Sequence, residues 1–180
     1  MRHDVIMTGV GGRGVLTAGL LLAQAALPEY QHILWFPSYQ AAMRGGPCEC
    51  SVILSDEEVY SPILSQTQTL IVIDTSQFQD FVSRVLPGGV IITETEGLHI
   101  NSVSNGIKLY KIPAMSLAMT QGDIQGSNFI LLGAYLEATG VLPLSMVEEE
   151  LRKRFGNKKK VLEANINALK EGKNYIKNLK

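Results

Sequence analysis

The stretch Asp4-Val5-Ile6-Met7-Thr8-Gly9-Val10-Gly11-Gly12-Arg13-Gly14 decides how the chain begins to fold. Its first half is a β-rich run, and its second half fits the pattern G-x-G-x-x-G. The apolar residues 16–27 that follow predict a buried helix, which Pro28 ends. Glycines let a backbone approach a ligand closely, and the free N–H groups of a helix N-terminus attract anions. The stretch therefore predicts either an anion-binding cradle, formed by Gly9, Gly11, Gly12, Arg13 and Gly14, or a tight turn that only packs a helix on a sheet.

The rest of the chain alternates apolar runs with helix-like stretches. Strands are predicted at residues 32–36, 51–54, 70–73, 90–93 and 108–112. Helices are predicted from the Asp74 cap, at 128–139, after Ser145 and at 158–179. This alternation predicts an α/β fold, a three-layer α/β/α Rossmann-like domain with a mostly parallel or mixed sheet and C-terminal helices. Without a linker or repeat, residues 1–180 are expected to form a single domain.

Several local details follow from individual residues. Pro37 should stop the strand at 32–36, and Pro87-Gly88-Gly89 should turn the chain before the strand at 90–93. Val85 should end the apolar stripe of the helix after Asp74. Caps are expected at Ser127 and, with Glu148, at Ser145. Gly172 should weaken the last helix.

A second candidate segment is Ser38-Tyr39-Gln40-Ala41-Ala42-Met43-Arg44-Gly45-Gly46, in a long connection between two predicted strands. Such connections often carry function. Arg44 followed by Gly45 and Gly46 offers a cation beside bare backbone, which suits a phosphate, a carboxylate or a partner loop. The alternative is a surface crossover with a turn. Tyr39, Arg44, Gly45 and Gly46 are therefore candidate binding residues.

Composition excludes several classes of protein. Apolar residues make up 46% of the 180, so the chain can bury a core, and two cysteines cannot form a disulfide scaffold. No run reaches the roughly 20 apolar residues of a membrane span, and no signal peptide is visible, so a cytoplasmic protein is expected. The net charge is −1. The charge is unevenly distributed: residues 1–150 hold 6 Lys/Arg and 15 Asp/Glu, whereas residues 151–180 hold 10 Lys/Arg and 2 Asp/Glu.

The basic end could be a nucleic-acid patch, but such patches carry interleaved aromatic residues and here only Tyr175 is present. A solvated helix face, or an arm that docks on an acidic partner, is therefore favoured. Cys48 and Cys50 are too few for a zinc or iron–sulfur site, which needs about four ligands. Neither a metal site nor a catalytic triad can be assembled. A dinucleotide site lacks the acidic residue expected after the second strand.

These motifs together resemble the gamma subunit of 2-oxoacid:ferredoxin (acceptor) oxidoreductases. The resemblance rests on the Gly-x-Gly-Gly-x-Gly start, Ser-Tyr-x-x-x-x-Arg-Gly-Gly at 38–46, Ser-Asp at 55–56 and Ser61-Pro62. The segments at 127–134 and 163–172 extend it over almost the whole chain. At three positions the sequence departs from the family pattern: Arg13 replaces the usual Gln, Gln40 a Gly, and Ala42 a frequent acidic residue.

The resemblance implies a complex that decarboxylates a 2-oxoacid to an acyl-CoA and passes electrons to ferredoxin. Thiamine diphosphate and iron–sulfur clusters would lie on partners: alpha and beta thiamine-binding subunits and a ferredoxin-like subunit. This chain would hold no catalytic residue and no tightly bound cofactor, and would contribute interfaces and part of the coenzyme A environment; isolated, it could form a homodimer. Asn128 would either anchor a neighbouring loop through hydrogen bonds or cap a helix.

The substrate expectation is 2-oxoglutarate. Two alternatives stay open from the residues: a stand-alone Rossmann-like nucleotide-binding oxidoreductase, and a non-catalytic interaction module whose glycine turn binds nothing.

Overall fold

The computed structural model describes residues 1–39, 45–100, 102–103, 106–120 and 126–179. Six strands of these ranges form one sheet in the order β2-β3-β1-β4-β5-β6. The strands are β1 (Arg2–Val10), β2 (His32–Tyr39), β3 (Pro47–Ser55), β4 (Thr67–Val72), β5 (Val85–Glu94) and β6 (Lys108–Ile112). β1, β4, β5 and β6 run parallel, whereas β3 is antiparallel to both β1 and β2. The predicted α/β fold is confirmed, with a mixed sheet.

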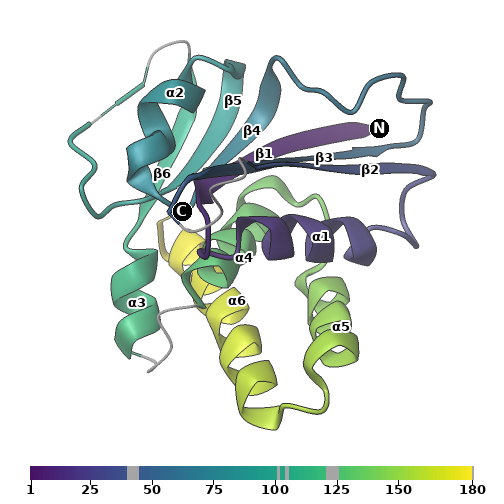
Figure 1. Cartoon of the computed structure of the whole chain (residues 1–180), viewed down its shortest axis with the longest axis vertical. Coiled ribbons are helices and arrows are strands. Elements are labelled where there is room, and N and C mark those ends of the chain that lie inside the picture. Colours follow the sequence, from purple (N-terminus) through teal and green to yellow (C-terminus); the bar gives the residue numbers. More distant parts are fainter. Residues whose placement is uncertain (40–44, 101, 104–105, 121–125, 180) are drawn as a thin grey trace.

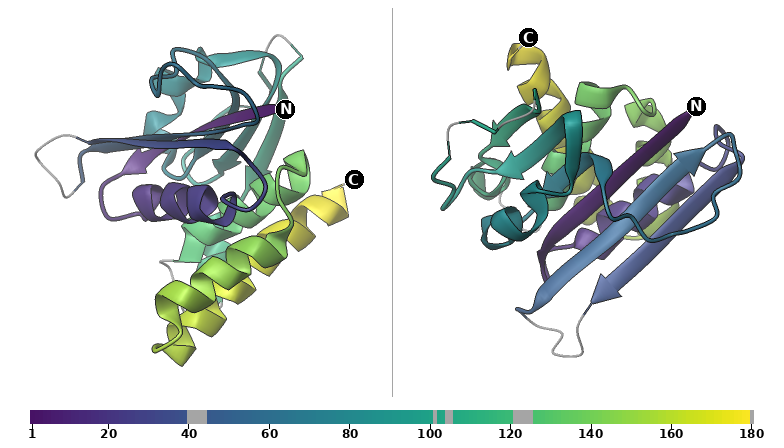
Figure 2. Two further views of the ribbon diagram at one scale, coloured as in Figure 1. Left: turned by 90° about the vertical axis from the view of Figure 1, so that its right-hand side faces the viewer. Right: turned by 90° about the horizontal axis from the view of Figure 1, so that it is seen from above.

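Helices cover the two faces of the sheet unequally (Figure 1; Figure 2). The helical segments are α1 (Val15–Ala25), the 3-10 turn η1 (Thr75–Gln77), α2 (Phe78–Val82), α3 (Ala114–Thr120), α4 (Ser127–Thr139), α5 (Leu144–Phe155) and α6 (Lys159–Leu179). The larger core lies between the sheet and α1, α4, α5 and α6. The other face is covered by α2 and connecting segments over a smaller core. None of the helices in the described ranges is long and apolar enough to cross a membrane.

α4 is the central helix of the thicker layer. Its residues from Ser127 to Leu136 are all buried, because the sheet contacts one side and α6 the other. Gly172 of α6 lies directly against the backbone of Ile130, and Gly133 of α4 lies against that of Leu169. The expectation that Gly172 weakens α6 is therefore incomplete: the missing side chain is what lets the two helices pack closely.

Five other local expectations were wrong. β2 continues through Pro37 to Tyr39, because β2 is an edge strand and an edge tolerates a residue without an N–H. Val85 begins β5, and Pro87-Gly88-Gly89 form an irregularity inside that strand. Neither Ser127 nor Ser145 caps its helix: the caps are Gly126 and Pro143, and neither makes a side-chain capping bond.

Candidate functional site

The glycine loop, residues 9–14, lies at the carboxyl ends of the parallel strands. Thr8 of β1 pairs with Val72 of β4, which pairs with Thr93 of β5, so these three strands end at one edge. Glu94 is the last residue of β5 and Asp74 lies two residues after β4, so both lie at the same edge. Open α/β sheets bind ligands outside the carboxyl ends of their strands. The fold thus places the glycine loop where such sheets carry a binding site.

Gly14 is the N-terminal cap of α1 and adopts a left-handed backbone, with φ 76°. A Cβ at this position would collide with the side chain of Asn128. Asn128 donates from Nδ2 to the carbonyl oxygen of Gly14 at 3.1 Å and accepts the Phe129 N–H at Oδ1, at 2.9 Å. The carboxamide is 3% exposed. Asn128 thus ties the start of α4 to the start of α1, across 114 residues of sequence.

The second predicted segment meets the glycine loop. The Gly11 N–H donates to the Gly46 carbonyl at 2.9 Å. The sheet register aligns Gly9 with Cys48, and Cys48 with Tyr39, so β2 ends level with the loop, with β3 between them. Arg44 lies outside the described residues, and its placement stays a prediction.

Arg13 carries the positive charge of the loop. Its Nε lies 3.9 Å from Asp74 Oδ2, its Nη1 is 3.6 Å from Met115 Sδ, and its side chain is 34% exposed. The other oxygen of Asp74 accepts the Ser76 N–H and hydroxyl, so it is occupied in capping η1. A guanidinium has five N–H donors. Arg13 keeps donors for an anion at the loop.

Glu94 fixes the far side of this edge and was missed from the sequence. It is 2% exposed. Its Oε1 accepts the N–H groups of Thr95 and Glu96, and its Oε2 accepts that of Met115 at 2.7 Å, at the start of α3. Because a buried carboxylate is costly without such donors, Glu94 holds the strand end and α3 together. The available signal was an acidic residue directly after an apolar strand, as at Asp74.

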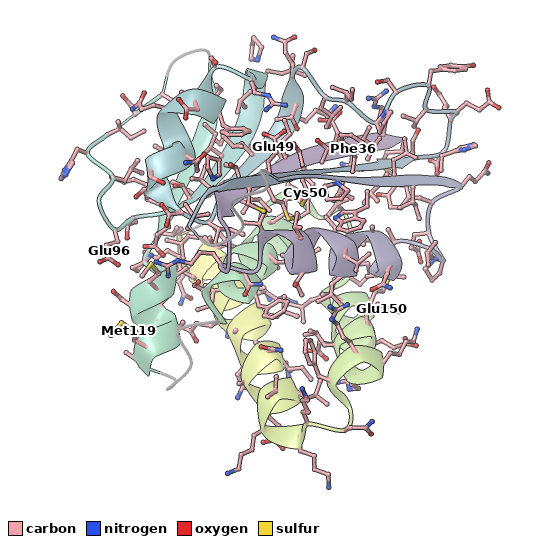
Figure 3. The ribbon with its side chains drawn as sticks, viewed as in Figure 1. Phe36, Glu49, Cys50, Glu96, Met119 and Glu150 are labelled. Atoms are coloured by element: carbon pink, nitrogen blue, oxygen red, sulfur yellow. The ribbon has the colours of Figure 1, made fainter. Side chains whose placement is uncertain are left out.

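The two cysteines lie beneath the loop, on β3. Cys50 is buried between the sheet and α1 (Figure 3), and its thiol donates to the Val15 carbonyl. Burial raises the pKa of Cys50 to about 12, and burial also raises the pKa of Cys48. Neither thiol is therefore a ready nucleophile. No group of three or more metal-binding side chains occurs within the described ranges.

The arrangement can bind an anion through backbone N–H groups and one guanidinium. The described residues of the loop and its surroundings bring no nucleophile–base pair together. The structure thus joins Gly9, Gly11, Gly12, Arg13, Gly14, Gly46 and Asn128 around one edge; that they bind a cofactor stays a prediction.

The chain is similar to subunits of known 2-oxoacid oxidoreductases. The sequence profile of the family "Pyruvate ferredoxin/flavodoxin oxidoreductase" matches residues 4–175. The ketoisovalerate oxidoreductase subunit VorA of Methanothermobacter thermautotrophicus is 32% identical over 171 residues, 93% of this chain and 35% of VorA. The 2-oxoglutarate synthase subunit KorC of Methanothermobacter marburgensis is 28% identical over 159 residues, 84% of this chain and 86% of KorC. The chain thus spans about a third of the length of VorA.

Two solved structures share the fold. The 2-oxoglutarate:ferredoxin oxidoreductase of Magnetococcus marinus, solved with 2-oxoglutarate, coenzyme A and succinyl-CoA, superposes with a TM-score of 0.90 at 22% identity, over 99% of this chain and 32% of that one. The keto/oxoacid ferredoxin oxidoreductase gamma subunit of Geobacter sulfurreducens superposes with a TM-score of 0.82 at 22% identity. The match covers 98% of this chain and 99% of that one. With the profile match over nearly its whole length, the chain belongs to the pyruvate ferredoxin/flavodoxin oxidoreductase family.

Proposed function

We propose that this chain is the gamma subunit of a 2-oxoacid:ferredoxin oxidoreductase and that its glycine loop forms part of the coenzyme A environment. The observation that carries the proposal is the bond from Asn128 to Gly14, which fixes the N-terminus of α1 beside Arg13. Coenzyme A is a polyphosphate, and amides at a helix N-terminus with a guanidinium suit phosphate oxygens. Coenzyme A is bound in the Magnetococcus marinus enzyme, whose fold includes this one.

In this proposal the chain contributes binding and orientation, and its partners contribute the redox chemistry. Thiamine diphosphate and the iron–sulfur clusters belong to alpha, beta and ferredoxin-like subunits. The support for the binding role is the start of α1 beside the Arg13 guanidinium, which suits binding of an anion. The residues proposed to form this coenzyme A or partner site are Gly9, Gly11, Gly12, Arg13, Gly14, Tyr39, Arg44, Gly45, Gly46 and Asn128, of which Asn128 is buried and holds Gly14 in place.

The substrate proposal is 2-oxoglutarate. Its support is the 28% identity to KorC, a 2-oxoglutarate synthase subunit, over 86% of that protein. VorA, named for ketoisovalerate, is 32% identical over a third of its length. Assays of the purified complex with 2-oxoglutarate, pyruvate and ketoisovalerate decide between them. A kcat/KM for 2-oxoglutarate below that for either competitor overturns this part of the proposal.

The stand-alone nucleotide-binding alternative loses support from the topology. In a dinucleotide-binding unit, the strand after the first helix lies next to the first strand. Here β3 lies between β1 and β2. Equilibrium dialysis with NAD(H) and NADP(H) should therefore detect no saturable binding.

The experiment that tests the binding role compares Arg13→Gln and Arg44→Ala complexes with the unaltered one. Both variants should raise the KM for coenzyme A or lower turnover more than they lower the melting temperature. If either variant lowers only the melting temperature, that residue has no functional role. If neither changes the kinetics, the chain is an interaction module with respect to coenzyme A.

A further inference from the structure

The turn that joins α5 to α6 forms the far end of a helical hairpin, which extends beyond α1 and the sheet (Figure 1; Figure 2). We call the four cations at this end the basic tip: Arg154, Lys158, Lys159 and Lys160. All four side chains are exposed. The tip lies on different elements from the glycine loop.

The charges of the hairpin divide into two groups. Arg152, Lys153 and Lys170 form ion pairs with Glu148, Glu149 or Glu150. The basic tip makes no ion pair with any other residue that the structure describes; Arg154 only lies over the Phe155 ring, 5.8 Å from its centre. Four like charges gathered at one end repel one another. Their positive potential is available to a molecule outside it.

The tip also carries apolar surface. Val161, on the first turn of α6, is 39% exposed, and Phe155 at the end of α5 is only partly buried. Protein interfaces combine an apolar centre with a charged rim that steers association. A rigid hairpin end with apolar residues between cations has this composition, on a small scale.

We propose that the basic tip docks on an acidic surface of a partner protein. Charge complementarity identifies the chemistry of the partner: its surface must supply carboxylates to the four cations. The body of the chain carries nine more acidic than basic residues within positions 1–150. That body repels an extended polyanion such as nucleic acid, which would run past the tip, whereas a compact carboxylate patch contacts the tip alone. This inference does not depend on the identity of the complex proposed above.

A zero-length carbodiimide cross-link tests the contact, because this reagent joins a lysine amine directly to a carboxylate. The native complex, purified gently at low salt, is treated and analysed by mass spectrometry. We expect Lys158, Lys159 or Lys160 to be joined to Asp or Glu of a different protein, and these links to vanish in about 0.5 M salt, where surface charges are screened. Links only within this chain or between its copies would overturn the proposal, as would an association that nuclease abolishes.

Charge reversal provides the matched variants. K159E/K160E changes the tip, and K173E/K177E makes the same change in charge about 20 Å or more farther along α6. We expect the tip variant to have the melting curve of the unaltered chain. Its affinity for the partner that the cross-link identifies should be about tenfold lower. The control should change that affinity less than threefold. Equal losses in both variants would show only a general charge effect and would overturn the tip assignment. The proposed function fails separately, if the purified complex contains neither a thiamine-binding subunit nor a ferredoxin-like subunit.

Discussion

The glycine loop and the basic tip use their polar groups in opposite ways. At the loop, residues from distant parts of the chain meet: Asn128 holds Gly14, Gly46 accepts from Gly11, and Asp74 faces Arg13. At the tip, the described cations make no ion pair within the chain. A loop fixed by its own fold is preorganised for a small ligand, whereas unpaired charge on a projecting hairpin suits a protein surface. The predictions below separate contacts that build the fold from contacts that serve a ligand.

The largest effect is expected where α4 and α6 touch through their glycines. Gly172→Ala places a methyl group against the backbone of Ile130, which cannot move without separating the helices. The free energy of unfolding, measured by urea titration, should fall by about 3 kcal/mol or more. Gly126→Ala is the control, because its new Cβ would lie 3.4 Å from Ala168, an ordinary contact. Equal stability of both variants would contradict the close packing.

The next effect is expected at Asn128. Asn128→Asp keeps the shape and the acceptor for the Phe129 N–H, but it replaces the donor to Gly14 with a second oxygen. The free energy of unfolding should fall by about 2 kcal/mol, and the KM of the complex for coenzyme A should rise. Asn174→Asp, on the exposed side of α6, should change neither quantity. A destabilised variant with an unchanged KM would leave Asn128 a purely structural residue.

A smaller effect on stability, with a larger one on binding, is expected at Arg13. Arg13→Gln removes an ion pair of 3.9 Å that is partly exposed, so the free energy of unfolding should change by less than about 0.5 kcal/mol. The KM for coenzyme A should rise about threefold to tenfold. Arg84→Gln is the opposite control: it loses a 3.2 Å pair with Glu49 of β3 and a bond to the Leu64 carbonyl, neither of which belongs to the glycine loop. It should lower stability without changing the KM.

The smallest effect at neutral pH is expected at Cys50. The folded chain raises its pKa to about 12, above the 9.0 of an unperturbed thiol. Its contribution to stability is therefore full below pH 9 and is lost as the pH rises from 9 towards 12. Between pH 9 and pH 12, the free energy of unfolding of Cys50→Ala should fall less with rising pH than that of the unaltered chain. Rapid alkylation of the native chain by iodoacetamide at pH 8 would contradict the buried position.

Local patterns predicted the strands, the glycine loop and the α/β class, because β-rich runs and glycine spacing are properties of neighbouring residues. The antiparallel insertion of β3 between β1 and β2 depends on pairing between distant strands, which no local pattern reports. The same limit applies to the site. Arg13 and Gly14 were found from their own motif, and Asn128 was expected either to anchor a neighbouring loop or to cap a helix. That its partner is Gly14, and that Glu94 lies at the same edge, follow only from the folded chain.

Gly172 shows the limit most clearly. In a single helix, a glycine reduces stability, and the sequence supports that interpretation alone. That Gly172 allows α6 to pack closely on α4 can be seen only once the two helices lie against each other.

The most direct test of the proposed function is anaerobic purification of the tagged chain from its own cells, with identification of co-purifying proteins and an assay of the eluate. We expect stoichiometric recovery of a thiamine-binding subunit and a ferredoxin-like subunit, with oxidation of a 2-oxoacid that requires coenzyme A. Recovery of the chain alone, at low as well as moderate salt, would contradict the account.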